Sequence, residues 1–365
     1  MGSNVYLRGI ATAVPKHRIP QQQILEFMKR NVELDSRKSR LLNLIYSRSA
    51  IEYRHSVIPD FALEPAKYEF FPSTPESSSD PTTAERNRIF VLEANLLAAE
   101  AAQTLIADLD IDPSKITHLI TASCTGFSAP GFDFHLVRAL PLNLDTERYH
   151  LGFMGCFAAM PAMRLARHIC RSNSGANVLF VNVEICTLHF RTADDLDSLV
   201  ANSLFADGAS AALVSSEVPD GEPKALLRGF ATTIVPDSED DMAWIIGDHG
   251  FDMRLSSYVP RVLGAHMGPL FETLLSRYQL DLLGVDHYAV HPGGRAIVDR
   301  VADSLELERS RLAPSYDVLA NYGNMSSATI MFVLKSILES GTGGRVVAAA
   351  FGPGLTVESA CLEIA

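Results

Sequence analysis

Apolar residues are spaced in two alternating ways along the chain, which predicts alternating helices and strands. A short strand is expected within residues 4–15, and a helix within 20–31. Residues 69–88 are polar and rich in Pro and Ser, which predicts a surface loop, whereas 88–109 carry apolar residues at helical spacing. Residues 116–124 are almost continuously apolar, as expected of a strand covered on both faces. The alternation continues to the C-terminus and predicts an α/β fold with a largely parallel sheet.

One pattern of residues occurs twice. A glycine followed by Cys156 begins a helix rich in small residues, and an apolar strand is reached at Val178, 22 residues later. A glycine followed by Asn324 begins a similar helix, and its strand is reached at Val346 after the same interval. The pattern indicates an internal duplication.

The strands that precede the two helices keep the same spacing. Cys124 ends a strand 32 residues before Cys156, and His291 ends a strand 33 residues before Asn324. We therefore predict two related halves. The first, residues 1–217, carries the cysteine, and the second, residues 218–365, carries the histidine and the asparagine.

The duplication predicts that three polar side chains converge. If a pseudo-twofold axis relates the halves, Cys156 and Asn324 begin equivalent helices that meet near the axis. His291 follows a strand, at the carboxyl edge where parallel α/β sheets place functional groups. Cysteine, histidine and asparagine would then meet at one point.

Cys156 is the candidate nucleophile. A helix N-terminus offers unpaired N–H groups and partial positive charge, which favour a thiolate and a lowered thiol pKa. Pro161 fits the first helical turn, where no N–H is required. The alternative is a buried structural cysteine, the more common state of a lone thiol.

His291 and Asn324 each have a structural alternative. A proline and two glycines follow His291, so the backbone can turn sharply and present the ring, although a capping or core histidine is the alternative. Asn324 could serve as a helix N-cap. Its pairing with Cys156 across the repeat favours an amide that donates to a substrate oxygen.

Composition excludes several classes of protein. The chain has 365 residues, 47% of them hydrophobic, and a formal net charge of −12, which disfavours nucleic acid but leaves an anionic ligand such as CoA open. Five widely spaced cysteines without a CxxC pair fit neither a disulfide framework nor a zinc site. With no secretory signal and no apolar run of about 18 residues, we expect a cytoplasmic protein without a membrane span.

Two other cysteine chemistries fit less well. A cysteine protease also uses Cys, His and Asn, but on a fold without duplicated halves. A thiolase-type enzyme would need a second catalytic cysteine late in the chain. Cys361 continues an apolar strand close to the C-terminus, so we expect it to be structural.

Five strings together resemble one enzyme family: "GFMGCFAAMPAMRLA", "LDSLVANSLFADGASAALV", "HPGGRAIVD", "NYGNMSSATI" and "AFGPGLTVE". The chain is similar over its whole length to the type III polyketide synthases, the chalcone and stilbene synthase group of thiolase-fold condensing enzymes. The resemblance implies a layered αβαβα fold built from two duplicated halves, and a homodimer. It also implies iterative decarboxylative condensation of CoA thioesters, with no metal or other cofactor.

The resemblance also implies roles for residues. Cys156 would carry the acyl chain as a thioester, His291 would keep the thiolate ionised, and both His291 and Asn324 would hydrogen-bond the thioester carbonyl. The resemblance assigns Arg48 and Arg54 to the region that binds CoA phosphates, although a solvated surface arginine is the alternative. The substrate-binding residues that it implies are Phe205, Met253, Trp244, His189, Cys124, Cys186, Ser326, Gly352, Pro353 and Gly354.

Departures from the plant enzymes bear on the substrate. Trp244 replaces a small glycine of the cavity wall, Met253 replaces a phenylalanine, and His189, Cys124 and Cys186 replace threonines, which argues against a coumaroyl starter. The strings "CTGFSAPGFDFHLV" and "HLGFMGC" are nearer the bacterial branch that makes alkylpyrones and alkylresorcinols from aliphatic acyl-CoA. The alternatives are a single-round enzyme like ketoacyl-ACP synthase III, served by a carrier protein, and a non-catalytic relative that binds acyl groups.

Overall fold

A nine-stranded sheet runs through the computed structural model, which describes residues 4–72, 80–217, 225–256, 259–278 and 280–364. Its strands lie in the order β11, β12, β13, β8, β1, β7, β6, β4, β5. Their bounds are β1 Tyr6–Ala13, β4 His118–Ser123, β5 Glu147–Gly152, β6 Asn177–Ile185, β7 Asp207–Ser215, β8 Ala225–Ile234, β11 His287–Val290, β12 Gly344–Gly352 and β13 Thr356–Ile364.

The strand order repeats across the middle of this sheet. From the centre outward, one side reads β1, β7, β6, β4 and the other β8, β13, β12, β11, and in each only the outermost pair of these four is parallel. The two sides meet through two residue pairs, Tyr6 with Leu226 and Leu7 with Ala225. The duplication is thus confirmed, but the sheet is mixed rather than largely parallel. The predicted boundary between 217 and 218 touches residues 218–224, which lie outside the described residues.

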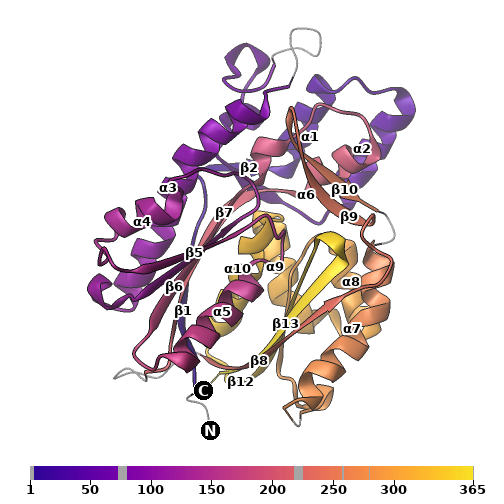
Figure 1. Cartoon of the computed structure of the whole chain (residues 1–365). Helices are drawn as coiled ribbons and strands as arrows, with labels where there is room; N and C mark the ends of the chain where they lie inside the picture. Colours follow the sequence, from indigo (N-terminus) through magenta and orange to yellow (C-terminus); the bar gives the residue numbers. More distant parts are fainter. Residues whose placement is uncertain (1–3, 73–79, 218–224, 257–258, 279, 365) are drawn as a thin grey trace.

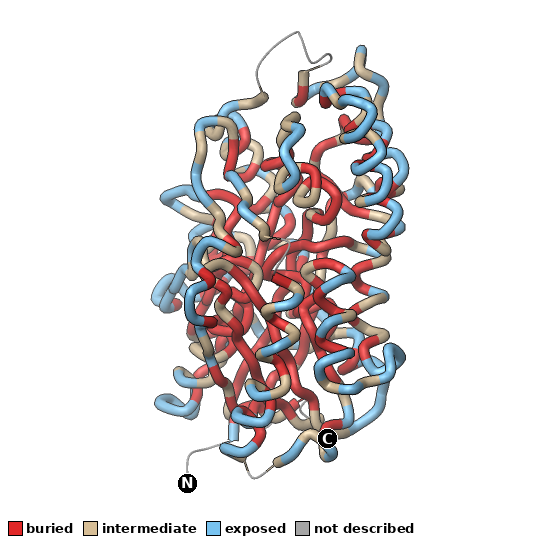
Figure 2. Tube along the Cα trace, turned by 90° about the vertical axis from the view of Figure 1, so that its right-hand side faces the viewer, coloured by how far each residue is buried: buried red, intermediate tan, exposed pale blue. Residues whose placement is uncertain are grey.

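Helices form three layers around the two halves of the sheet (Figure 1). The middle layer is α5, Ala159–Ser172, and α10, Thr329–Glu339, which pack against strands of both halves. One outer layer contains α3, Thr83–Asp108, and α4, Phe132–Ala139; the other contains α7, Val259–Ser276, and α8, Arg295–Ser304. Figure 2 shows the buried trace between these layers, and the αβαβα fold is confirmed.

Smaller elements cover one end of the layers, at the top of Figure 1. Two short sheets stand apart from the large one: β2 with β3, and the hairpin β9–β10. The bounds are β2 His17–Pro20, α1 Gln21–Asn31, α2 Ser36–Arg48, β3 Tyr53–Ser56, α6 Leu196–Leu204, β9 Met242–Gly247 and β10 Gly250–Leu255. Helix α9, Ala313–Tyr322, packs against α10.

Helix α3 begins earlier than its apolar pattern predicts. The Thr82 side chain accepts a hydrogen bond from the N–H of Glu85, and the Glu85 carboxylate accepts one from the N–H of Thr82. This reciprocal cap starts the helix at Thr83, inside the stretch that we predicted to be a loop. Residues 73–79 of that predicted loop lie outside the described residues.

Within the part of the chain that the structure describes, α3 is also the one helix long and apolar enough to cross a membrane. It packs against β1, β6 and β7. Its apolar length is therefore explained by its place in the outer layer, against the core of the protein.

Candidate active site

Cys156 lies in a tight turn directly before α5, as predicted. Gly155 has φ +91°, and a Cβ on it would lie 2.2 Å from Cδ of Pro353. On the opposite side, a Cβ on Gly352 would lie 2.5 Å from the ring of Phe157. The turn before α5 therefore packs so closely against the "FGPG" loop that only glycine fits at positions 155 and 352. Cys156 is partly exposed, whereas the other four cysteines are buried.

His291 follows the last residue of β11, and its backbone N–H donates to the carbonyl of Ala349 at 2.8 Å. The side chain is buried, and neither ring nitrogen has a hydrogen-bond partner among the described residues. Buried polar atoms are nearly always paired. An unpaired imidazole is therefore available to a group that the chain itself does not supply.

The Asn324 side chain makes hydrogen bonds on both sides of its amide. Its Oδ1 accepts from the N–H of Ser326 at 2.9 Å, at the start of the 3-10 turn Ser326–Ala328. Its Nδ2 donates to the carbonyl of Gly293, two residues after His291, at 3.3 Å. Neither this turn nor α10 has a side-chain N-cap, so the capping alternative is wrong, and the bond to Gly293 holds the amide on the side of His291.

The charge states of this group differ from our expectation. Burial raises the pKa of the Cys156 thiol to about 12, although hydrogen bonds from Ser326 and Asn324 act in the opposite direction. Burial lowers the pKa of His291 to about 3. The prediction of a lowered thiol pKa was wrong, because loss of solvent outweighs the helix N-terminus. Burial thus favours the uncharged form of each side chain.

A buried acidic residue that the sequence did not single out, Glu184, lies near Cys156. It accepts hydrogen bonds from the Cys124 N–H (3.0 Å), the Cys124 thiol (3.2 Å), Thr125 Oγ1 (2.9 Å) and Ser327 Oγ (2.5 Å). The Cys124 thiol also lies 3.1 Å from Oγ of Ser326. The sequence signal that could have indicated Glu184 is that it is the one charged residue in the apolar strand β6. Burial raises the pKa of Glu184.

Two cavities lie on either side of α6's last turn. The inner cavity, about 240 Å³, is lined by Phe205, Trp244, Met253, His189 and Cys186, all predicted pocket residues. The outer cavity, about 220 Å³, is lined by a second set that includes Leu204, Gly293, Gly294, Arg48 and Arg295. Among the other predicted pocket residues, Cys124 contacts Glu184, Ser326 contacts Cys156, and Gly352, Pro353 and Gly354 form the loop against Gly155.

Trp244 is fixed in the wall of the inner cavity. Its Nε1 donates to the carbonyl of Cys124 at 2.7 Å, and its ring meets those of His189 and Phe251 edge to face. His189 stacks on Phe251 with ring centroids 4.1 Å apart, and its Nδ1 accepts from the Phe251 N–H at 3.0 Å. His189 Nε2 therefore carries the proton and donates to the carbonyl of Thr125 at 2.8 Å.

The two candidate CoA arginines have different surroundings. Arg48 is exposed at the outer cavity. Arg54 is 2% exposed, and its guanidinium donates to Gln21 and to the carbonyls of Asn202 and Phe205. Arg54 thus supports the segment that carries Phe205, and it is not a surface ligand for phosphate. Sequence position alone could not distinguish the two, because burial depends on contacts with distant segments.

Family models and relatives identify the class of this protein. The models for the N-terminal and C-terminal domains of chalcone and stilbene synthases match residues 2–218 and 227–364. The alpha-pyrone synthesis polyketide synthase-like Pks18 of Mycobacterium tuberculosis is 30% identical, over 98% of this chain and 91% of the relative. The chain therefore belongs to the chalcone and stilbene synthase family.

Solved structures agree with this assignment. The C-terminal type III polyketide synthase domain of Steely1 from Dictyostelium is 28% identical and superposes with a TM-score of 0.90, covering 99% of both chains. PKS-I of the brown alga Ectocarpus siliculosus is 28% identical, with a TM-score of 0.93 over 100% of this chain and 99% of that one. The protein is a type III polyketide synthase, an acyl-transferring enzyme that condenses malonyl units iteratively.

Proposed function

We propose that Cys156, His291 and Asn324 carry out this condensation. The unpaired ring nitrogens of His291 support the proposal most directly, because they are free to accept a proton. In the loading step, the Cys156 sulfur attacks the carbonyl carbon of an acyl-CoA, and the thiol proton passes to His291. The CoA sulfur leaves with that proton, and the acyl group stays on Cys156 as a thioester.

In the extension step, malonyl-CoA loses CO2 and becomes an enolate of acetyl-CoA. Nε2–H of His291 and Nδ2–H of Asn324 would donate hydrogen bonds to the thioester oxygen, which gains negative charge. The enolate carbon then attacks the acyl carbon on Cys156, and the Cys156 thiolate leaves. The product is a chain two carbons longer on CoA, which can load Cys156 again.

We further propose an aliphatic acyl-CoA starter and a pyrone or resorcinol-type product. Aromatic rings and Met253 line the inner cavity, and a flexible thioether adapts to apolar chains of different shape. The Mycobacterium relative is named for alpha-pyrone synthesis.

The outer cavity is the proposed entrance for CoA. Its wall is mostly apolar, which suits the pantetheine arm, and the exposed Arg48 and Arg295 at its rim would attract the phosphates. It borders Leu204 and Gly293, next to the catalytic residues. CoA thioesters serve as both substrates in this proposal, with no further cofactor.

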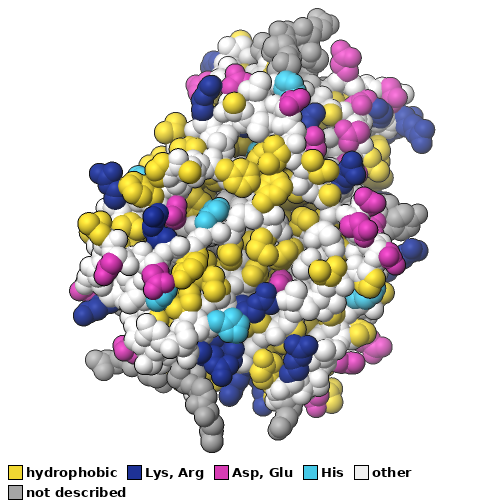
Figure 3. Space-filling view, in the orientation of Figure 1, with side chains coloured by type: hydrophobic (Ala, Val, Ile, Leu, Met, Phe, Trp, Pro, Cys, Tyr) yellow, Lys and Arg dark blue, Asp and Glu magenta, His cyan; other side chains and the backbone are white. Residues whose placement is uncertain are grey.

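We propose a homodimer formed through the edge strand β5. Almost every residue of β5 is exposed, and an open strand edge is normally covered. Exposed apolar residues surround it: Leu92 and Leu96 of α3 are 66% and 62% exposed, and Phe134 of α4 is 42% exposed. Figure 3 shows hydrophobic side chains gathered on the face that carries β5 in Figure 1. Such an enzyme would act in the cytoplasm, where CoA thioesters are available.

One experiment tests the catalytic proposal. The protein is incubated with acyl-CoA starters of several lengths plus malonyl-CoA, and products and intact protein are analysed by mass spectrometry. We expect an acyl adduct on Cys156 and ring-closed triketides or tetraketides, both lost in Cys156→Ala but retained in Cys361→Ala, which alters a buried cysteine of β13. Single condensation products alone would favour the ketoacyl synthase alternative, and no adduct with any starter would refute the proposal.

A further inference from the structure

The hairpin β9–β10 forms one wall of the inner cavity. Trp244 of β9 pairs directly with Met253 of β10, and both line the cavity. The hairpin is a two-stranded sheet separate from the large sheet. Its position therefore depends on side-chain contacts and loop contacts rather than on strand pairing with the core.

The tip of the hairpin is tied to the start of α3. The N–H of Thr83 donates to the carbonyl of Asp248 at 2.8 Å, and the N–H of Gly250 donates to Oγ1 of Thr83 at 2.9 Å. The same hydroxyl contacts the carbonyl of Gly247. Thr83 thus bonds to three residues of the hairpin tip, Gly247, Asp248 and Gly250.

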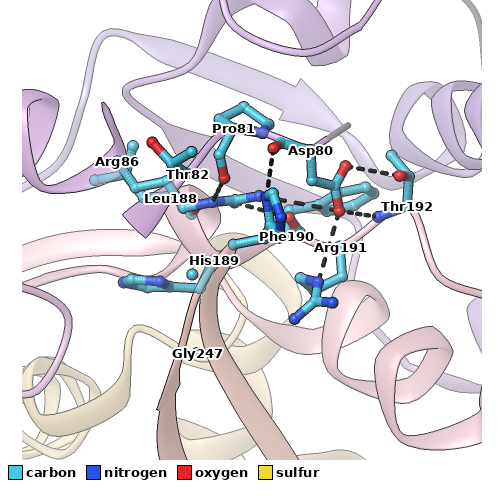
Figure 4. A network of polar contacts seen from close by, with 12 residues as sticks. Asp80, Pro81, Thr82, Arg86, Leu188, His189, Phe190, Arg191, Thr192 and Gly247 are labelled. Atoms are coloured by element: carbon cyan, nitrogen blue, oxygen red, sulfur yellow. Dashed lines mark hydrogen bonds and ion pairs between the residues drawn. The ribbon is translucent and has the colours of Figure 1, made fainter. Parts of the chain in front are cut away.

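Arg86, one helical turn further along α3, connects this tip to the opposite cavity wall. Its side chain is fully buried, and Figure 4 shows it beside Pro81 and Leu188. Nε donates to the carbonyl of Pro81 at 2.7 Å, and Nη1 donates to the carbonyls of Phe190 (2.9 Å) and Leu188. A Cβ on Gly250 would lie 3.1 Å from Cδ of Arg86, so the hairpin backbone rests on this side chain.

Asp80 supplies the charge partner for Arg86. Its carboxylate lies 4.0 Å from Nη2 of Arg86 and accepts from the N–H and the hydroxyl of Thr192, at 3.0 and 2.6 Å. It also lies 3.6 Å from Nε of Arg191, which forms an ion pair with Asp252 of β10. A buried guanidinium needs such a partner, since an uncompensated buried charge is strongly destabilising.

We propose that Arg86 and Asp80 are positioning residues: they fix the hairpin β9–β10, and with it Trp244, and so limit how far the growing chain extends before it cyclises. This inference rests on the proposed function. Neither side chain is among the described residues that line the cavity, so both act through Trp244 rather than on the substrate. Releasing the hairpin would let the indole move outward and would give the chain more room.

The fluorescence of Trp244 reports the position of the hairpin directly, because it is the only tryptophan in the chain. The test compares Asp80→Asn, which removes the charge but keeps an oxygen for Thr192, with Thr83→Val, which removes the hydroxyl at the hairpin tip. Arg86→Lys is included because it keeps the positive charge but loses the guanidinium N–H donors. Arg88→Lys is the matched control, because Arg88 lies on the same helix and is exposed.

Three quantities are measured on each purified variant: tryptophan emission with acrylamide quenching, the ratio of longer to shorter polyketides, and the rate of Cys156 acylation by the starter. We expect Asp80→Asn and Thr83→Val to shift the emission to longer wavelength. The product ratio should change by about threefold or more, the effect of losing one hydrogen bond. Acylation of Cys156 should stay within about twofold of wild type, a change smaller than that hydrogen-bond effect, and Arg86→Lys should fall between wild type and Asp80→Asn.

The outcomes separate this inference from the proposed function. Unchanged emission in both variants would overturn the role in positioning, and changed emission with an unchanged product ratio would overturn the role in chain length. If Asp80→Asn does not fold, Arg86→Lys decides, since it keeps the buried charge and loses only the guanidinium N–H donors. A wild-type protein that makes no polyketide would instead refute the proposed function.

Discussion

Asn324 and Phe205 are joined by a backbone bridge. The N–H of Asn324 donates to the carbonyl of Leu204 at 2.9 Å, and the N–H of Ala206 donates to the carbonyl of Asn324 at 2.8 Å. Phe205 lines the inner cavity, and Leu204 lines the outer one. The bridge therefore holds Asn324 beside Leu204 and Phe205, the two residues between the inner and the outer cavity.

Because this bridge is made by the main chain, replacing the Asn324 side chain should affect the extension step without affecting the loading step. In Asn324→Ala the main-chain bridge remains, but the donor to the thioester oxygen is lost. We expect acylation of Cys156 to persist while condensation falls by about 10²–10³-fold, the cost of removing one oxyanion donor. Intact-protein mass spectrometry measures the first step, and CO2 release from malonyl-CoA measures the second.

Asn321→Ala is the matched control for Asn324→Ala. Asn321 lies in α9, three residues before Asn324, but is exposed, and its amide donates to the carbonyl of Asp317. This variant should keep both steps. An equal loss of acylation and condensation in Asn324→Ala would show that the amide has no separate part in extension.

Gly155→Ala should damage the site through packing. A Cβ there would lie 2.2 Å from Cδ of Pro353, and φ +91° is unfavourable for any side chain. We expect a loss of about 1–3 kcal/mol in the free energy of unfolding, measured in urea, together with slower acylation of Cys156.

Gly354→Ala tests the effect of backbone strain without the steric contact that Gly155→Ala also introduces. Gly354 also has positive φ, at +66°, but a Cβ on it meets nothing within 4 Å. This substitution should cost only about 1–2 kcal/mol, the price of a left-handed conformation, and should leave acylation unchanged. Equal effects of both alanines on acylation would mean that close packing of the loop does not position Cys156.

Trp244→Gly should lengthen the products. Removing the indole enlarges the inner cavity and exposes the rings of His189 and Phe251 to the growing chain. We expect additional malonyl extensions, detected as heavier polyketides by mass spectrometry. Trp244→Phe keeps most of the bulk but loses the donor to Cys124, so it should stay near the wild-type product. Unchanged product length in Trp244→Gly would remove this residue from the control of chain length.

Residues related by the duplication could be predicted from the sequence. Cys156 and Asn324 occupy equivalent places before α5 and α10, and the Asn324 side chain reaches the Cys156 sulfur and the carbonyl of Gly293, two residues after His291. The five cavity-lining residues came from the resemblance. In contrast, Arg86 and Glu184 contact segments about 60 to 100 residues away, and even the lone charge of Glu184 in an apolar strand does not indicate which segments those are.

Electrostatic properties were the least predictable part of the site. The helix N-terminus before α5 suggested an acidic thiol, but burial dominates and raises the pKa of Cys156. Arg54 shows the same limit, because the resemblance assigned it to the region that binds CoA phosphates whereas the folded chain buries it. Both errors arise from desolvation, a quantity set by the assembled tertiary structure.

The last prediction concerns stability at acidic pH. Burial lowers the pKa of His189 to about 3, and unfolding returns it to about 6.5. Between these values the unfolded chain binds the extra proton, so the contribution of His189 is complete above pH 6.5 and is lost as the pH falls toward 3. Asp207 acts in the opposite direction, because burial raises its pKa to about 6. The contribution of Asp207 is the same in wild type and in a His189 variant, so it cancels when their unfolding free energies are compared.

His189→Gln tests this sign directly. The glutamine amide can replace both hydrogen bonds, to the Thr125 carbonyl and from the Phe251 N–H, but it cannot be protonated. Between pH 7.5 and 5, the variant should lose about 2 kcal/mol less unfolding free energy than wild type, measured in urea at both pH values. His266→Gln, at a partly exposed histidine of α7, is the control and should follow the wild type. If His189→Gln also follows the wild type, the folded protein tolerates a charged His189, and the imidazole is not the neutral, hydrogen-bonded ring described above.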